Sequence, residues 1–290
     1  MNKTDVFDRH RPLLFSIAYR MLGSVMEAED AVQEAFLRWE RADGTEVRSP
    51  RAYLCAVVTR LCIDQLRSAR MQREEYVGPW LPEPLLSGGD PDAVEASELD
   101  DTLSIAFLVL LESLSPVERA VFLLREVFGY EYAEISGVVG KSETNCRQIS
   151  HRARAAVAAR RPRFDSSPEQ EERLMETFLA ASMNGDTQAL LALLAEDVTL
   201  YSDGGGKVTA ARNPITGPDN VARFLFGIIN KAPPGLSIRR ALVNGRPGLV
   251  AYFEDGRPQS VGSLELAEGR IRAIHLVVNP DKLLALPPLP

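Results

Sequence analysis

The sequence predicts a multidomain chain in which two all-α domains, the second with a helix-turn-helix, precede an α+β domain. Apolar residues recur every three or four positions through the first half, a stretch rich in proline and glycine interrupts them, and β-like runs separated by glycines fill the last third. The chain of 290 residues is long enough for two or three globular domains. We expect domains at 1–76, 100–163 and 166–290, with a linker at 77–99.

The first domain is expected to be helical throughout. Apolar residues follow helical spacing over three stretches, which glycines and a proline separate: 11–22, 27–41 and 51–73. The linker that follows is rich in proline and glycine and then becomes acidic between Asp90 and Asp101, which indicates an extended tether. A linker that is merely solvated would explain these acids as well.

The second domain carries the signals of a helix-turn-helix. Helical spacing resumes at about 98–112, and Ser115-Pro116 followed by Glu118 is typical of a helix N-terminus. We then expect a helix at 131–139, a turn at Gly140-Lys141 and a second helix at 142–159 that Ser142 caps.

The second of these helices has two different faces. At 100° per residue, one arc is apolar and contains Cys146, Ile149, Ala153, Ala156 and Val157. The opposite side is polar and contains Thr144, Arg147, Gln148, His151, Arg152 and Arg154. Long donors near the start of a helix can read base edges, and cations farther along can contact phosphates, so we expect this helix to read DNA. A solvated polar face is the alternative interpretation.

The charge distribution limits how the chain can bind DNA. Residues 141–163 include seven Lys or Arg and one acid, a local net charge of +6, whereas the whole chain has a net charge of −7. Nonspecific binding depends on neutralising phosphates, so the chain is not expected to coat nucleic acid. Any DNA contact must come from local basic surfaces.

The last third of the chain predicts an α+β domain. Helical stretches are expected at 169–183, 187–194 and 218–229. Runs typical of β-strands, separated by glycine turns, are expected at 198–202, 207–211, 236–243, 249–254, 260–266 and 271–278.

Other features exclude several classes of protein. No segment approaches the roughly 20 apolar residues that cross a bilayer, so we expect a cytoplasmic protein without a membrane partner. Cys55, Cys62 and Cys146 form no C-x-x-C pair, and the three histidines are far apart in the sequence. We therefore expect no disulfide framework, no metal site and no cofactor.

Two segments of the first domain point to a family. The run from Ala28 to Trp39, together with the segment from Tyr53 to Arg67, resembles the two most characteristic helices of extracytoplasmic-function sigma factors, the promoter-recognition subunits of RNA polymerase. The resemblance implies that the first helix docks on core RNA polymerase through Asp30, Gln33, Glu34 and Arg38. On spacing alone, this helix could equally be an ordinary amphipathic helix with a polar face.

The second of these helices faces the melted −10 promoter element in that family. The resemblance therefore implies DNA contacts by Arg60, Asp64, Arg67 and Arg70. The spacing of the residues also predicts that this helix has an apolar face and a polar face. The apolar face consists of Leu54, Val57, Val58, Leu61 and Cys62. The basic helix from Ser142 would then contact the −35 element.

Three short motifs resemble the signature of one subgroup, sigma factors with a fused C-terminal SnoaL-like domain. The first, in the linker, consists of Trp80, Leu81, Pro82, Glu83 and Pro84. The second consists of Asp203, Gly204, Gly205, Gly206 and Lys207, and the third of Asn279, Pro280, Asp281, Lys282 and Leu283. The resemblance implies a cone-shaped α+β domain with a regulatory role, in which these motifs contact the linker or the sigma domains.

An enzymatic role for the third domain is the competing hypothesis, because some SnoaL-like proteins are cyclases or isomerases. The candidates for acid-base chemistry are Asp203, Asp255, His275 and Asp281, which would have to share one sheltered pocket. A lone histidine in an apolar run is more often a core residue, and Asp-Gly-Gly-Gly also fits a tight turn. We therefore expect no catalytic residues.

The combined prediction is an alternative sigma factor that binds core RNA polymerase and promoter DNA and carries a built-in regulatory domain. A sigma factor binds polymerase as one copy, so we expect a monomer. A ligand-responsive helix-turn-helix regulator that binds DNA without polymerase, and a SnoaL-type enzyme with a DNA-binding extension, are the two alternatives.

Overall fold

The structure, a computed structural model, describes residues 2–42, 47, 49–73, 76–87, 101–159 and 167–289. The chain divides into two compact units. We call Met1–Glu75 with Leu108–Arg161 the helical unit, and Tyr76–Phe107 with Pro162–Pro290 the sheet unit. Most of the expected acidic stretch, the cations Arg160, Arg161 and Arg163, and the side chain of Arg70 lie outside the described residues.

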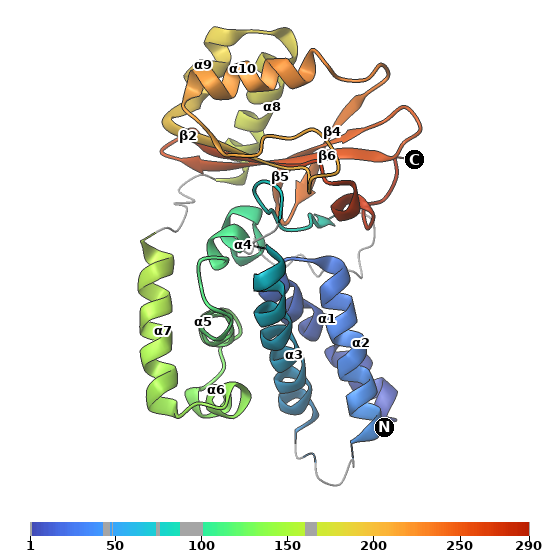
Figure 1. The fold of residues 1–290 in the computed structure, drawn as a ribbon, viewed down its shortest axis with the longest axis vertical. Helices are drawn as coiled ribbons and strands as arrows, with labels where there is room; N and C mark the ends of the chain where they lie inside the picture. Colours follow the sequence, from blue (N-terminus) through green and yellow to red (C-terminus); the bar gives the residue numbers. More distant parts are fainter. Residues whose placement is uncertain are drawn as a thin grey trace. The chain divides into compact units, whose positions relative to one another are not determined.

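The helical unit contains the N-terminal helices and the helix-turn-helix (Figure 1). Its first three helices are α1 (Lys3–Leu22), α2 (Val25–Arg41) and α3 (Pro50–Arg73). After α4 (Ile105–Leu111), which spans the division between the units, come α5 (Pro116–Phe122), a π turn (Leu123–Val127), α6 (Tyr132–Val139) and α7 (Glu143–Ala158).

Local sequence explains where these helices begin and end. Ser115 and Glu118 form a capping box with Pro116 in the first turn of α5, as the sequence predicts. Gly140 ends α6 with a φ of 66°, and Ser142 then caps α7 by accepting a hydrogen bond from the Asn145 amide at 3.2 Å. The result is the short turn that a helix-turn-helix requires.

Buried side chains join the N-terminal helices to the helices that follow the linker. Arg119 of α5 is only 3% exposed and donates to the carbonyl oxygen of Met21, at the end of α1, at 2.6 Å, and to that of Leu111 at 2.8 Å. A buried guanidinium is tolerated because it is hydrogen-bonded. These contacts stabilise the packing of α5 against the end of α1.

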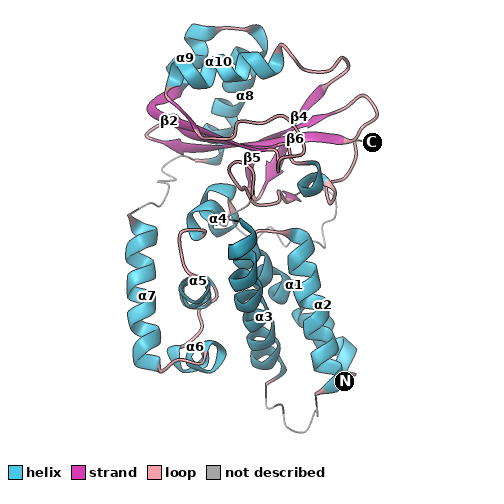
Figure 2. Cartoon of the chain, in the orientation of Figure 1, coloured by secondary structure: helices cyan, strands magenta, loops and turns pink. Residues whose placement is uncertain are grey.

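The sheet unit consists of one seven-stranded sheet with helices on one face (Figures 1 and 2). Its helices are α8 (Pro168–Asn184), α9 (Thr187–Leu193) and α10 (Pro218–Ile229), and short 3-10 turns lie at Asp101–Leu103 and Pro280–Leu283. Its strands are β1 (Leu86–Ser87), β2 (Leu194–Asp203), β3 (Ile215–Thr216), β4 (Ser237–Val243), β5 (Arg246–Tyr252), β6 (Pro258–Ala267) and β7 (Arg270–Val277).

The strands lie in the order β1-β4-β5-β6-β7-β2-β3, and β2 with β7 is the parallel pair. Alternate residues of β2 and β7 bury the side chains of Val198, Leu200 and Ile274 against the helices, where Leu190 and Val221 complete the core. The predicted fold class, all-α domains followed by an α+β domain, is confirmed.

Three details of the sheet differ from the sequence prediction. The expected strand at 207–211 is wrong, because residues 204–208 form a turn in which the Lys207 amide donates to the Gly204 carbonyl at 3.0 Å. Strand β3 instead pairs with Thr199 and Leu200 of β2. Strand β1 was not expected, since its partner β4 is distant in sequence and nothing local in a Pro-rich segment indicates pairing.

Candidate functional site

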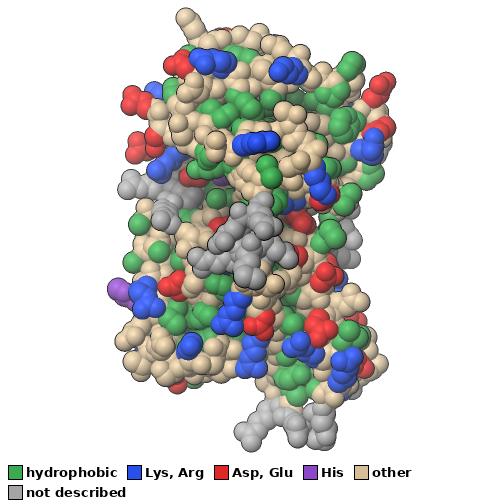
Figure 3. Space-filling model, in the orientation of Figure 1, with side chains coloured by type: hydrophobic (Ala, Val, Ile, Leu, Met, Phe, Trp, Pro, Cys, Tyr) green, Lys and Arg blue, Asp and Glu red, His purple; other side chains and the backbone are tan. Residues whose placement is uncertain are grey.

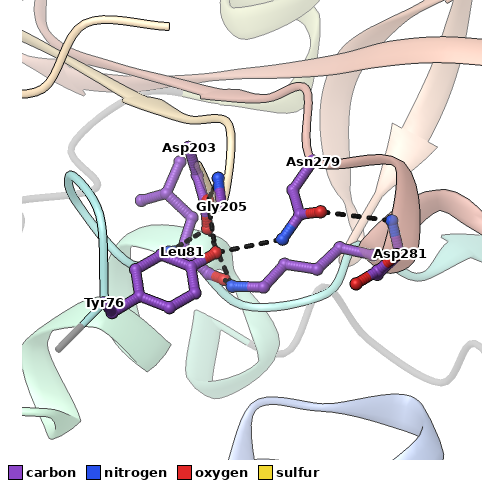
Figure 4. Close-up of polar contacts among 7 residues, drawn as sticks. Tyr76, Leu81, Asp203, Gly205, Asn279 and Asp281 are labelled. Atoms are coloured by element: carbon purple, nitrogen blue, oxygen red, sulfur yellow. Dashed lines mark hydrogen bonds and ion pairs between the residues drawn. The ribbon is translucent and has the colours of Figure 1, made fainter. Parts of the chain in front are cut away.

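The linker motif lies in the sheet unit, where it is hydrogen-bonded to Asp203 at the end of β2 (Figure 4). The Asp203 side chain is fully buried and accepts four hydrogen bonds. One carboxylate oxygen accepts from the Tyr76 hydroxyl at 2.6 Å and the Gly205 amide at 3.0 Å, and the other accepts from the Leu81 amide at 2.8 Å and Lys282 Nζ at 2.7 Å. A buried carboxylate is stable only when it is paired in this way.

Lys282 supplies the balancing charge. Its side chain is buried, forms an ion pair with Asp203 and also donates to the carbonyl oxygen of Leu81. Its ammonium nitrogen lies 4.2 Å from the centre of the Trp80 ring and 5.1 Å from that of Tyr76, which is cation-π geometry. Lys282 therefore contacts this segment through a hydrogen bond and two cation-π contacts, while its charge is balanced by Asp203.

Asn279 and Gly205 complete the arrangement. The Asn279 side chain donates to the Tyr76 hydroxyl at 3.0 Å and accepts from the Asp281 amide at 3.2 Å. Gly205 has a φ of 59°, and a Cβ there would overlap the Asn279 amide, so only glycine fits without strain. We call Asp203, Gly205, Asn279 and Lys282 the linker seat.

Burial and the neighbouring Asp203 carboxylate raise the pKa of the Tyr76 hydroxyl above its usual value. Tyr76 therefore stays protonated and remains a hydrogen-bond donor to Asp203. The linker residues that follow, Leu81 to Pro84, are buried as well. This part of the linker is consequently a packed segment of the sheet unit.

A second contact fixes the linker farther along. Asn244 is fully buried and has a φ of 51°. Its side-chain oxygen accepts from the Leu85 backbone amide at 2.9 Å, and its backbone amide donates to the Leu85 carbonyl oxygen at 2.7 Å. The same side chain donates to the carbonyl of Leu103 at 3.0 Å. One asparagine therefore contacts both ends of the segment that includes residues 88–100.

The structure brings some residues of the three motifs into direct contact and leaves others outside. Leu81, Asp203, Gly205, Asn279 and Lys282 meet directly. Lys207 and Asp281 instead form an exposed ion pair, with each side chain 54% exposed.

The remaining motif residues have supporting positions. Gly204 has no room for a Cβ beside Ala210, and Gly206 has a φ of 72° and lies against Val77. Pro82, Glu83, Pro84 and Leu283 are buried, whereas Pro280 is exposed.

Helix α7 presents the polar face that its sequence predicts. Thr144, Arg147, Gln148, His151, Arg152 and Arg154 are all exposed. Cys146, Ile149, Ala153 and Val157 are buried on the other side.

Surface ion pairs hold the three arginines of this face. Arg147 pairs with Glu143 at 3.0 Å and lies over the Tyr132 ring at 5.1 Å. Arg152 and Arg154 pair more loosely with Glu118 and Glu126, at 3.9 and 3.7 Å. Figure 3 shows acidic and basic side chains interspersed over the helical unit.

Helix α2 places its polar residues on one exposed side. Asp30, Gln33 and Arg38 are exposed and Glu34 is half-buried, with Arg38 paired to Glu34 at 2.8 Å. Leu37 lies on the same side and is 41% exposed. Sequence reasoning missed Leu37, because a leucine in an amphipathic helix is normally expected in the core.

Helix α3 shows an unexpected contact. Arg60 donates to the carbonyl oxygens of Val138 at 2.9 Å and Gly137 at 2.5 Å, at the C-terminal end of α6. A guanidinium there satisfies carbonyls that lack helical partners and interacts favourably with the helix dipole. Asp64 and Arg67 are exposed and pair with each other at 3.3 Å.

Comparisons with known proteins identify these helices. A model of sigma-70 region 2 matches residues 6–71, and a model of sigma-70 region 4 matches residues 104–157. An ECF RNA polymerase sigma factor of Mycobacterium tuberculosis, SigJ, is 37% identical over 97% of this chain and 93% of its own length. The chain belongs to the extracytoplasmic-function sigma factors.

Other members agree with this. A second M. tuberculosis protein, named "Probable ECF RNA polymerase sigma factor SigI", is 33% identical over 94% of this chain and 92% of its own. The crystal structure of SigJ aligns with a TM-score of 0.78 and 35% identity over 96% of this sigma factor and 97% of that chain. The alignment includes the C-terminal domain, so the predicted fusion of sigma domains with a C-terminal α+β domain is confirmed.

The candidate acid-base residues of the sigma factor do not share one cavity within the described residues. Asp203 belongs to the linker seat, Asp281 pairs with Lys207, and Asp255 pairs with Arg257 at 2.8 Å. His275 of β7 is 2% exposed and stacks on Tyr201, with 5.5 Å between ring centres. Burial lowers the pKa of His275 to about 4, so the ring is neutral at pH 7.

Two residues of the linker contacts were not recognised from sequence. Tyr76 stands at the expected domain boundary, where nothing local indicates a distant carboxylate partner. Asn244-Gly245 fits a two-residue hairpin turn, which predicts its conformation but not its bond to Leu85.

Among the described helices, none has the length and apolarity that crossing a bilayer would need.

Proposed function

We propose that this sigma factor binds core RNA polymerase and directs promoter-specific initiation in the cytoplasm, as a monomer and without catalysis of its own, and that the linker seat makes the sheet unit its regulator. The observation that carries the regulatory part is the buried Asp203, which bonds Tyr76, directly before the linker, and Leu81 within it. In a sigma factor, the segment joining regions 2 and 4 sets how far apart the two DNA-binding regions can move. When the linker seat binds that segment, it should therefore limit the spacings between the −35 and −10 elements that the sigma factor can span.

We assign core polymerase binding to the exposed side of α2, through Asp30, Gln33, Glu34 and Arg38. Contacts to the −10 element are assigned to Arg60, Asp64, Arg67 and Arg70, and contacts to the −35 element to Thr144, Arg147, Gln148, His151, Arg152 and Arg154. Exposure of the α7 residues, and of Asp30, Gln33 and Arg38 on α2, supports these roles. Arg60 must leave the carbonyls of α6 before it can reach DNA.

Run-off transcription with core polymerase tests both parts of the proposal. The full chain should initiate from its promoter, and the free chain should bind the same duplex weakly. Lys282→Met removes a buried charge from the linker seat, and Lys207→Met, its matched control, removes an exposed one. We expect the first variant to change promoter-dependent transcription severalfold at unchanged polymerase affinity, and the second to behave as wild type.

Specific duplex binding that is as tight without polymerase would favour a conventional helix-turn-helix regulator. Equal transcription by both lysine variants would contradict the regulatory role of the seat and leave the sigma activity untouched.

A further inference from the structure

The sheet unit contains a cavity of about 560 Å³ between the sheet and helices α8 and α10. Side chains from strands β5, β6 and β7 line its other side. Cavities of this size hold drug-sized ligands in other proteins. All its lining residues belong to the sheet unit.

The lining is apolar. Among its described residues there is no Asp, Glu or His, and the one charged side chain is Lys231, which is exposed. Four of the lining side chains are large hydrophobic groups that are nevertheless exposed: Met183, Val208, Ile228 and Phe253. Hydrophobic side chains are visible on the surface of this unit in Figure 3. Exposed apolar groups beside an apolar hollow are typical of a ligand site.

Two further features fit a bound molecule. Ser182 lines the cavity, is 4% exposed, and its hydroxyl has no hydrogen-bond partner within the described part of the chain. A polar atom of a ligand would supply the missing partner. Gly262 of β6 also lines the cavity, and a Cβ built there meets no atom within 4 Å, so the wall is open at that point.

The cavity shares a wall with the linker seat. Ser202, which lines the cavity, directly precedes Asp203 on β2. Pro280 and Leu283 line it as well, on either side of Lys282 in the chain. The segments that hold the linker on one side therefore face the cavity on the other.

We propose that this cavity binds a small apolar molecule with an anionic end group, and that occupancy stabilises the linker seat. Lys231 would pair with the anionic end, and the apolar body would pack against the back of β2 and the 280–283 turn. Among the described lining residues the one ionisable side chain is the exposed Lys231, and acid-base catalysis needs groups placed together in a sheltered pocket, so binding rather than turnover is expected. A regulatory consequence of binding rests on the proposed function of the seat, whereas binding itself does not.

Anilinonaphthalene sulfonate, an aromatic anion that fluoresces in apolar surroundings, is a suitable probe. Titration of the full chain should give saturable binding of one probe molecule. Gly262→Leu fills the cavity and should weaken binding at least tenfold. Gly227→Leu is the matched control, because its Cβ also meets no atom within 4 Å but the residue does not line the cavity.

Ser260→Leu, at a second lining position, replaces Gly262→Leu if that variant does not fold. Absence of saturable binding would overturn the proposal, and so would wild-type affinity in the folded filling variant. No polymerase or DNA is present, so this result is independent of the transcription assays.

Coupling between the sites is reciprocal, which gives a second measurement. Tyr76→Phe removes the hydroxyl that bonds Asp203 and Asn279, and it should weaken probe binding roughly fivefold. Tyr201→Phe removes a hydroxyl in the same unit that makes neither of these bonds, and it should leave probe affinity unchanged. Equal affinities for the two variants would overturn the coupling to the linker.

Discussion

The linker seat and the recognition helix both depend on charged side chains, but their surroundings are opposite. In the seat, Asp203 and Lys282 are 0% and 8% exposed, pair with each other and both bond the Leu81 backbone of the linker. On α7, the side chains of Arg147, Arg152 and Arg154 are 55 to 64% exposed and form surface pairs with nearby carboxylates. Buried charges fix a conformation, whereas exposed ones stay available to a partner such as DNA.

The largest effect is expected in the seat. Asp203→Ala leaves the Lys282 ammonium buried without its counter-charge, which should lower the free energy of unfolding by roughly 3 to 5 kcal/mol. Urea unfolding of the full chain, followed by circular dichroism, measures this change. Asp281→Ala, which breaks an exposed pair in the same region, should cost less than about 1 kcal/mol. Similar losses in the two variants would mean that the seat is no more than a surface contact.

His275 extends the comparison to pH. Its folded pKa of about 4 lies below the usual 6.5, so the unfolded chain binds more protons between these values and stability is lost as pH falls through this window. Lowering the pH from 7 to 5 should therefore cost about 2 kcal/mol through His275 alone.

The measurement compares urea unfolding of the wild type and His275→Gln at both pH values. The variant should show the smaller pH dependence, because its other titrating groups are unchanged. Identical pH dependences would show that the ring can take up its proton in the folded protein.

Sequence patterns predicted the seat and the recognition helix to different depths. Periodicity and the Ser142 cap were sufficient for α7, because a helix is fixed by local bonds and its faces follow from 100° per residue. Three motifs indicated Asp203, Asn279 and Lys282 as a set, yet the partner residues Tyr76 and Asn244 could not be predicted. Their bonds span more than 120 positions in the chain, and such contacts depend on tertiary packing that local spacing does not encode.

Among the exposed charges of α7, Arg147 is the candidate for reading a base edge. Arg147→Ala should then lose roughly 1 to 3 kcal/mol of discrimination between the preferred and other base pairs at one −35 position. Stability should hardly change, because the Arg147–Glu143 pair is on the surface. Competition binding of the polymerase complex to promoters with single substitutions in the −35 element measures the discrimination. A loss of equal size on every promoter would instead assign Arg147 to a phosphate.

The smallest effect is expected from Arg154, farther along the same helix. Its ion pair with Glu126 is long, at 3.7 Å, so Arg154→Ala should change the free energy of unfolding by less than about 1 kcal/mol. If Arg154 contacts a phosphate, Arg154→Ala should weaken binding by a similar factor on all promoters. It should also lower the slope of log affinity against log salt by about one. Salt titrations of wild type, Arg147→Ala and Arg154→Ala separate the two roles, because a base contact alters sequence preference and a phosphate contact alters the salt slope. If Arg154→Ala changed the preferred −35 sequence, the reading face of α7 would extend one turn farther than its N-terminal half.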